Sequence, residues 1–290
     1  MTIVGFRLIF SLKIEILNCN LYRFVGKTEM IVIVIVKQVP EIALIKVDTT
    51  ANQVVLPSGP GVLNPFDEYA VEEALRIKEK TNGKVVVMSV GTDRTESALR
   101  DCLALGVDDA YLLSDATFVG SDPQAIAKIL SAGVKKFGAC DLILAGKQAI
   151  DSDSAQVPAA VAANLDLPQA MFVKKFESYE GGKAKVHRTT EDGYEVIELT
   201  LPAVVSVVKE INEPRLPSLK GKMAAKKKEI VKWSAADLGL TPDGIGAQSR
   251  TQTVSVTPPP PRPKGEIISG DSPEDIANKL FDKLRQNQVI

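Results

Sequence analysis

The sequence predicts an α/β protein built on a parallel sheet, and three observations support this prediction. Short β-branched runs alternate with helix-like segments from residue 31 to residue 165. The runs at 31–37 and 142–145 are apolar throughout, as in strands that are covered on both faces. Asp192-Gly193 separates two extended runs, which is typical of a hairpin. We therefore expect a Rossmann-like parallel sheet with right-handed crossovers and an antiparallel addition.

Residues 1–29 do not fit this alternation. Arg7, Lys13 and Glu15 interrupt their apolar run too often for a transmembrane helix, and neither the core nor the cleavage site of a signal peptide is clear. Met30 then begins a strong strand. We interpret residues 1–29 as an N-terminal extension that arises from start-codon choice; a membrane-tethering segment is the alternative.

From Met30 onward each element follows from its pattern. We expect a strand at 31–37, a small hairpin over 43–57 with its turn at Thr50–Asn52, and a helix that begins at Asn64-Pro65 and ends at Gly83. Glu72 and Arg76 form a favourable i,i+4 pair on that helix. Further strands at 84–90 and 109–113 alternate with helices around 97–105 and from Asp122-Pro123 onward.

The stretch from Asp141 to Leu165 reads as a strand, a polar loop and a helix that begins near Ala155. Asp151, Asp153 and Ser154 are predicted to cap that helix, and Pro158 suits its opening turn. A helix N-terminus after a parallel strand can bind an anion. We expect the loops at 36–40, 64–67, 89–93 and 146–157 to meet at one edge of the sheet, where ligands of open α/β sheets bind. An ordinary capped helix without a ligand explains these residues equally well.

After Pro168 the pattern changes to extended segments at 170–177, 183–190 and 194–201, followed by a buried strand at 202–208. A loop over 209–228 comes next. Pro258 to Pro263 form a stiff linker, and Ser272-Pro273 begins a helix with Ile276, Leu280, Phe281 and Leu284 on one face.

Composition excludes several classes of function. The chain has 290 residues, of which 45% are hydrophobic, and a net charge of −1, so no bulk attraction to nucleic acid is implied. The three cysteines form no Cys-x-x-Cys pair, which indicates buried thiols in a reducing cytoplasm. The single histidine is expected as an exposed strand residue, and no His-rich metal site is predicted.

Three stretches resemble the beta subunit of electron-transferring flavoproteins, the family that includes FixA. They are G-K-Q-A-I-D-S-D-S-A-Q-V-P at 146–158, V-H-R-T-T-E-D-G-Y-E-V-I-E-L-T-L-P-A-V-V-S at 186–206, and K-E-I-N-E-P-R-L-P-S-L-K-G-K-M-A-A-K-K-K at 209–228. They stand in the order that the family has. The resemblance covers Met30 to Lys228 and continues more weakly to the end of the chain.

The resemblance implies a nucleotide-binding domain of the adenine nucleotide alpha-hydrolase type. The implied nucleotide contacts are Ile35, Asn64, Pro65, Phe66, Asp67, Val90, Gly146, Lys147, Gln148, Ala149, Ile150, Asp151, Ser152, Asp153, Ser154, Ala155, Gln156 and Val157. Apolar side chains would flank an adenine ring, and backbone N–H groups at 153–156 would hold a phosphate. The implied ligand is AMP with a structural role. Ala155-Gln156-Val157 is nearer to electron-bifurcating members, which hold a second FAD there and oxidise NADH.

The resemblance also implies an electron-carrier subunit without catalytic residues of its own. Such a subunit pairs with an alpha subunit, which holds most of one FAD. It carries electrons from acyl-CoA or similar dehydrogenases, as in fatty acid beta-oxidation, to a quinone oxidoreductase. Two other classes stay open. A universal-stress-type regulatory module would share the sheet but not the Glu-Pro-Arg loop or the C-terminal arm. A freestanding dehydrogenase would need its own flavin site and acid–base group, and no convincing set is present in the sequence.

Partner docking falls on the loop at 209–228. An ordinary solvated loop would explain its prolines and lysines, but its apolar residues suggest anchors for a partner, with the family's anchor leucine at Leu219. The implied docking residues are Leu216, Leu219, Met223, Lys226, Lys227 and Lys228. We expect three regions: the extension 1–29, the nucleotide-binding domain 30–257, and an arm at 258–290 that docks on the alpha subunit.

Overall fold

The computed structural model describes residues 29–48, 50–51, 53–260, 262 and 264–290. The extension predicted over 1–29, and Cys19 within it, therefore lies outside the described residues except for Glu29. The described residues form two compact units, one from those within 29–46 and 55–255, the other from those within 47–54 and 256–290. The first unit holds the sheet and its helices.

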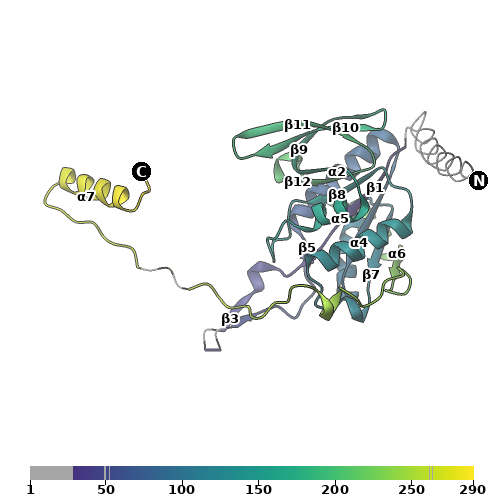
Figure 1. Ribbon diagram of the computed structural model, residues 1–290, viewed down its shortest axis with the longest axis horizontal. Helices are drawn as coiled ribbons and strands as arrows, with labels where there is room; N and C mark the ends of the chain where they lie inside the picture. The colour runs from purple at the N-terminus through teal and green to yellow at the C-terminus, as the bar shows by residue number, and fades with distance from the viewer. Residues whose placement is uncertain (1–28, 49, 52, 261, 263) are drawn as a thin grey trace, which may run out of the picture. The chain divides into compact units, whose positions relative to one another are not determined.

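A nine-stranded sheet forms the centre of the first unit, in the order β11-β10-β9-β12-β8-β1-β6-β7-β13 (Figure 1). Strand β1 (Ile31–Ile35) lies between β6 (Lys84–Val90) and β8 (Leu142–Gly146) and runs parallel to both. Strand β7 (Asp109–Leu113) and strand β12 (Ala203–Val207) extend the parallel part outward. Val32, Ile33 and Val34 are fully buried because helices cover both faces of β1. The predicted parallel sheet is confirmed.

Each face of the sheet has its own apolar core. Helices α2 (Pro65–Thr81) and α3 (Glu96–Leu105) contribute to one core, and α4 (Pro123–Phe137) and α5 (Val157–Leu165) to the other. Helix α4 begins after Asp122, as predicted, and the Asp122 side chain caps it by accepting a hydrogen bond from the Ala125 N–H. At the end of α2, Asn82 rather than the predicted Gly83 takes the left-handed conformation, so the helix ends one residue earlier.

The predicted antiparallel addition is also present. Strands β10 (Lys183–Thr190) and β11 (Gly193–Thr200) form a hairpin, and β9 (Gln169–Glu180) pairs with β10 antiparallel and with β12 parallel. His187 lies on β10 and is half-buried rather than exposed, because its ring stacks on Tyr194 and hydrogen-bonds Glu177. Two shorter sheets, β2 (Gln38–Val39) with β5 (Val62–Leu63) and β3 (Lys46–Asp48) with β4 (Gln53–Val55), lie between β1 and α2 in the sequence. The turn predicted for the second includes Asn52, outside the described residues.

The region predicted as a loop over 209–228 contains two helices. A short 3-10 helix, η4 (Lys209–Ile211), precedes an extended stretch, and α6 (Leu219–Lys227) follows it. The Ser218 hydroxyl caps α6 by accepting a hydrogen bond from the Gly221 N–H. Strand β13 (Ile230–Trp233), which was not predicted, then pairs with β7 at the edge of the sheet. The prolines and Gly221 hide the helical pattern in the sequence.

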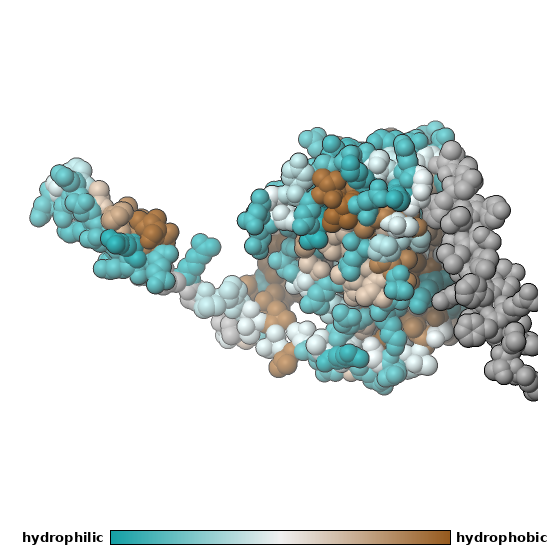
Figure 2. Space-filling model, turned by 45° about the horizontal axis from the view of Figure 1, so that its top comes forward, coloured by the Kyte–Doolittle hydropathy of each residue, from teal (hydrophilic) through white to brown (hydrophobic). Residues whose placement is uncertain are grey.

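The second unit contains the helix predicted near the C-terminus, α7 (Pro273–Gln286). The Ser272 hydroxyl caps it by accepting a hydrogen bond from the Asp275 N–H. Leu280 and Phe281 are about half exposed, and Figure 2 shows hydrophobic side chains gathered on one side of this helix. Across the described parts of the chain, no helix is both long and apolar enough to cross a membrane.

Candidate functional site

The carboxyl ends of β1, β6 and β8 open into a cavity of about 430 Å³, which we call the crevice. Strand β1 leads to β6 on one side and β8 lies on the other, so the crevice is at the point where the strand order reverses. Its size lies within the range of about 300–1,000 Å³ that is common for small-molecule sites. The four loops that the sequence predicted to converge do contribute residues to this edge of the sheet.

Twelve of the residues implied by the resemblance line the crevice: Ile35, Asn64, Asp67, Val90, Gly146, Gln148, Ala149, Ser152, Ser154, Ala155, Gln156 and Val157. Ile35 and Val90 supply apolar wall at the ends of β1 and β6, which suits a flat aromatic ring. Sequence reasoning missed a second group of lining residues. They lie near α4 and further along the chain, namely Ser121, Asp122, Pro123, Ile126, Leu130, Thr251, Gln252 and Thr253.

Asp67 links the carboxyl ends of β1 and β8 at the base of the crevice. One carboxylate oxygen accepts a hydrogen bond from the Lys37 N–H at 2.7 Å, and the other accepts one from the Gly146 N–H at 3.1 Å. Burial raises the pKa of Asp67 from 3.8 to about 7, although these hydrogen bonds and one from Asn64 act to lower it. The group therefore titrates near neutral pH inside the crevice.

Gly146 is the close-approach point of β8. A Cβ atom at this position would lie 2.5 Å from Asp67 Oδ1 and 2.6 Å from the Phe66 carbonyl carbon. No real side chain fits there, so only glycine allows the N-terminus of α2 to reach the strand end. This packing brings Asn64 and Asp67 into the crevice.

Asn64 holds the polar loop between β8 and α5. Its side-chain amide donates to the Gln148 carbonyl at 2.9 Å, and its amide oxygen accepts from the Ile150 N–H at 3.2 Å. Asn64 is 1% exposed. It therefore fixes the shape of this loop through the loop's own backbone.

The three residues predicted to cap α5 do not do so. The residue before the helix is Gln156, and no side chain caps it. Asp153 and Ala155 have positive φ values of 53° and 51°, which turn the chain away from a capping geometry. Asp151 instead pairs with Lys37 at 2.6 Å, and Asp153 accepts a hydrogen bond from the Gln148 side chain. A left-handed Ala155 followed by a right-handed Gln156 resembles the backbone nests that bind anions.

A second cavity, of about 700 Å³, shares no lining residue with the crevice, and we call it the outer cavity. Phe66 and Lys147 line it, whereas their neighbours Asp67 and Gly146 line the crevice. The Lys147 ammonium lies 4.7 Å from the centre of the Phe66 ring. The rest of the lining comes from Phe172, Arg188, Thr189, Thr190, Glu191, Val208, Lys209 and Glu210.

The remaining implied nucleotide residues lie outside both linings. Pro65 is the first residue of α2, and Ile150, Asp151 and Asp153 belong to the loop between β8 and α5. The implied docking residues do not line the crevice and lie on α6 or close to its two ends. Leu216, Leu219 and Met223 are 91%, 77% and 60% exposed. Lys226 and Lys227 are exposed, but Lys228 Nζ donates to the Val107 and Asp108 carbonyls and is held in place.

The fold and the crevice define a doubly wound α/β protein with a small-molecule site at its switch point. Residues 34–238 match the family described as Electron transfer flavoprotein domain. The chain belongs to this family, among its beta subunits and FixA proteins. This membership decides against the universal-stress-type alternative.

Three relatives illustrate the similarity. The chain is 42% identical to the Caffeyl-CoA reductase-Etf complex subunit CarD of Acetobacterium woodii, over 90% of this chain and all of that protein. Identity and coverage are the same for the electron transfer flavoprotein subunit beta of Thermoanaerobacterium thermosaccharolyticum. Protein FixA of Azotobacter vinelandii is 37% identical, over 87% of this chain and 93% of its own length.

Proposed function

We propose that this chain is the beta subunit of a heterodimeric electron transfer flavoprotein and holds an adenine nucleotide in the crevice. The observation that supports this best is the crevice itself. It combines apolar walls at Ile35 and Val90 with a loop that Asn64 holds in shape, and this loop contains the nest at Ala155-Gln156. The apolar walls suit an adenine ring, and the nest suits a phosphate.

The electron-carrying role follows from the family. An alpha subunit would hold most of one FAD, which supplies the redox chemistry, while this chain binds the nucleotide and contacts partners. Acyl-CoA or related dehydrogenases would donate electrons, and a quinone oxidoreductase would accept them. Residues 264–290 would dock on the alpha subunit, since the apolar face of α7 is exposed. The cytoplasm is the proposed location.

The identity of the nucleotide separates two versions of this function. AMP would fill the crevice alone and act as a structural ligand. FAD would need further room, and we propose that it would extend past Phe66 and Lys147 toward the outer cavity. Two observations agree with FAD as the ligand: the similarity to a subunit of a caffeyl-CoA reductase-Etf complex, and the sequence Ala155-Gln156-Val157. The second candidate function is therefore electron bifurcation, with a second FAD in this chain and NADH as donor.

Extraction of the purified heterodimer with acid, followed by chromatography, tests both versions. One FAD and one AMP per heterodimer is the result for the structural role, and two FAD without AMP is the result for bifurcation. A heterodimer that releases one FAD and no other nucleotide would contradict both. Deletion of residues 264–290 tests the assembly, because sedimentation should then show separate subunits. A flavin-loaded, monodisperse beta chain without its partner would contradict the heterodimer.

A further inference from the structure

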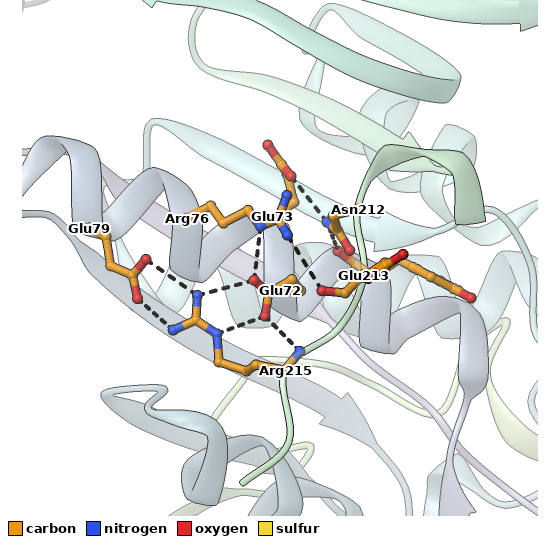
Figure 3. A network of polar contacts seen from close by, with 8 residues as sticks. Glu72, Glu73, Arg76, Glu79, Asn212, Glu213 and Arg215 are labelled. Carbon is orange, nitrogen blue, oxygen red and sulfur yellow. Dashed lines mark hydrogen bonds and ion pairs between the residues drawn. The ribbon is translucent and has the colours of Figure 1, made fainter. Parts of the chain in front are cut away.

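The stretch 212–228, which we call the docking segment, is fixed to the rest of the fold by side chains that the function described above does not use. Arg215 lies at its start and faces helix α2 (Figure 3). The Arg215 Nε atom donates to Glu72 at 2.7 Å, and the guanidinium also donates to Glu79 at 2.5 Å. The Arg215 backbone N–H donates to Glu72 at 3.1 Å. One arginine therefore joins two carboxylates that lie about two turns apart on α2.

We call the group of Arg215, Glu72 and Glu79 the clamp. The carboxylate at its centre, that of Glu72, is buried. The Glu72 side chain is 5% exposed, and Arg76 also donates to it at 2.9 Å. Burial alone would raise the pKa of Glu72, but the hydrogen bonds from Arg215 and Arg76 outweigh it and lower the pKa. Glu72 is therefore ionised at neutral pH. Charge-assisted hydrogen bonds to a buried carboxylate are stronger than exposed ion pairs.

Neighbouring residues extend the clamp toward η4. The Asn212 side chain donates to the Tyr69 carbonyl at 3.0 Å and to Glu73 at 3.1 Å. Arg76 donates to the Glu213 carbonyl at 3.4 Å. Asn212, Glu213 and Arg215 are thus all hydrogen-bonded to residues of α2.

The far end of the docking segment is fixed to α3 instead. Arg100 donates to the carbonyls of Ala225 and Lys228 at 3.0 and 3.2 Å, where the last carbonyls of α6 lack helical partners. Gly221 faces α3 so closely that a Cβ atom there would lie 2.3 Å from the Ala104 carbonyl oxygen. Helix α6 therefore presents its opposite side to solvent.

Between these two fixed ends stand the apolar side chains proposed for docking. Leu216 directly follows Arg215, and Leu219 and Met223 are one helical turn apart on α6. Because they are exposed, they supply no packing that would order the segment. If a loop becomes ordered only on binding, the loss of its conformational entropy weakens the complex. Because the clamp already orders the segment in the free protein, binding would not incur this entropy loss.

We propose that Arg215 is a positioning residue, which preforms the docking segment by bridging Glu72 and Glu79. The proposal rests on the docking role proposed above. It adds that the affinity for the electron-donating dehydrogenase depends on a residue that does not itself face that partner. Arg215 touches no reacting group, and the crevice is lined by other residues.

Two substitutions at this position separate positioning from charge. Arg215→Ala removes both bridges, while Arg76 still pairs with Glu72, so the fold retains a partner for its buried carboxylate. Arg215→Lys keeps the charge but cannot reach both carboxylates as a planar fork does. Lys220→Ala is the matched control, because it removes one positive charge from an exposed position of the same segment.

Amide hydrogen exchange of the FAD-loaded heterodimer is the first measurement. We expect exchange in residues 212–223 to be faster by about tenfold or more in Arg215→Ala, intermediate in Arg215→Lys and unchanged in Lys220→Ala. Exchange in β1 and β6 should stay the same in all of them. Unchanged exchange in 212–223 for Arg215→Ala would overturn the proposal.

Reduction by an acyl-CoA dehydrogenase, itself reduced with butyryl-CoA, is the second measurement. The dehydrogenase concentration at half-saturation should rise by about tenfold in Arg215→Ala, while the rate at saturation and the FAD content stay the same. A lower saturating rate at unchanged half-saturation, or an equal effect in Lys220→Ala, would also overturn positioning. Faster exchange with unchanged kinetics would instead refute the docking role of the segment, so the two failures can be told apart.

Discussion

In the crevice, polar side chains are buried and bond to the backbone of nearby loops, whereas in the docking segment apolar side chains are exposed and polar ones hold the backbone. Asn64 and Asp67 are 1% and 5% exposed, while Leu216 and Leu219 are 91% and 77% exposed. The crevice is thus part of the folded core. The docking segment is a separate surface feature that a few ion pairs fix in place.

This difference determines what a substitution should do in each region. A change in the crevice should affect the fold and the ligand together, because the same atoms serve both. A change in the docking segment should affect the partner and leave the fold intact. Four substitutions test this comparison.

The largest effect is expected for Gly146→Ala. The new Cβ atom would collide with Asp67 and with the Phe66 backbone, which cannot move without displacing α2. We expect a loss of more than about 3 kcal/mol in unfolding free energy, together with loss of the bound nucleotide. Thermal unfolding and nucleotide extraction measure the two losses. Gly59→Ala is the control, since no atom lies within 4 Å of its Cβ position. Unimpaired nucleotide content in Gly146→Ala would show that the strand end and the ligand are independent.

Asp67 should make stability depend on pH. Its pKa is raised from 3.8 to about 7 in the fold, so its contribution to stability is complete below pH 3.8 and is lost as the pH rises toward 7. Between pH 5 and pH 8 this amounts to roughly 2–3 kcal/mol in the unfolding free energy. Denaturant unfolding at several pH values should show this decline, and Asp67→Asn should lack it. The exposed Asp192→Asn should retain the decline; a parallel decline in Asp67→Asn would assign it to other groups.

Leu219→Ala should separate docking from folding. The side chain is largely exposed, so its truncation should leave the unfolding free energy and the FAD content unchanged. Docking on the dehydrogenase should weaken by about 1–2 kcal/mol if the side chain becomes buried in the complex. Titration calorimetry with the dehydrogenase and thermal unfolding give the two values. Loss of FAD in this variant would place Leu219 in the structural core of the assembly.

The smallest effect is expected for the double substitution of Lys226 and Lys227 by alanine. Both side chains are exposed at the end of α6 and would act on a partner only through long-range attraction. The association rate should fall a few-fold at low ionic strength and converge with the wild-type rate at high salt. The effect of Lys228→Ala on the association rate should not follow this salt dependence, because the Lys228 ammonium group donates hydrogen bonds to two backbone carbonyls of the same chain. A salt-independent decrease for Lys226 and Lys227 would indicate direct contacts instead.

The sequence predicts the crevice better than the docking segment, for a physical reason. Parallel strands place their following loops at one edge of the sheet, so the positions of Asn64, Val90 and Gly146 follow from the alternation alone. The caps expected at Asp151, Asp153 and Ser154 failed because left-handed residues within the loop redirect the chain. Such conformations are rare outside glycine, and nothing in the sequence marks them.

The wall formed by Thr251 to Thr253 was missed because its position depends on the path of the whole chain. Asp122 both caps α4 and accepts hydrogen bonds from the Thr251 N–H and hydroxyl group, a contact between residues more than a hundred positions apart. Helix α6 was missed because Gly221 and the prolines suggest a loop. Gly221 is present because α6 approaches α3 closely, which is a tertiary requirement.

The contact between Asp122 and Thr251 also has a consequence for biosynthesis. The crevice takes one wall from Ile35, near the start of the first unit, and another from Thr253, near its end. A ribosome must release almost all of this unit before that second wall can close. A ligand that requires both walls can therefore bind only the completed fold, and it would protect finished chains from unfolding without speeding the early steps of folding.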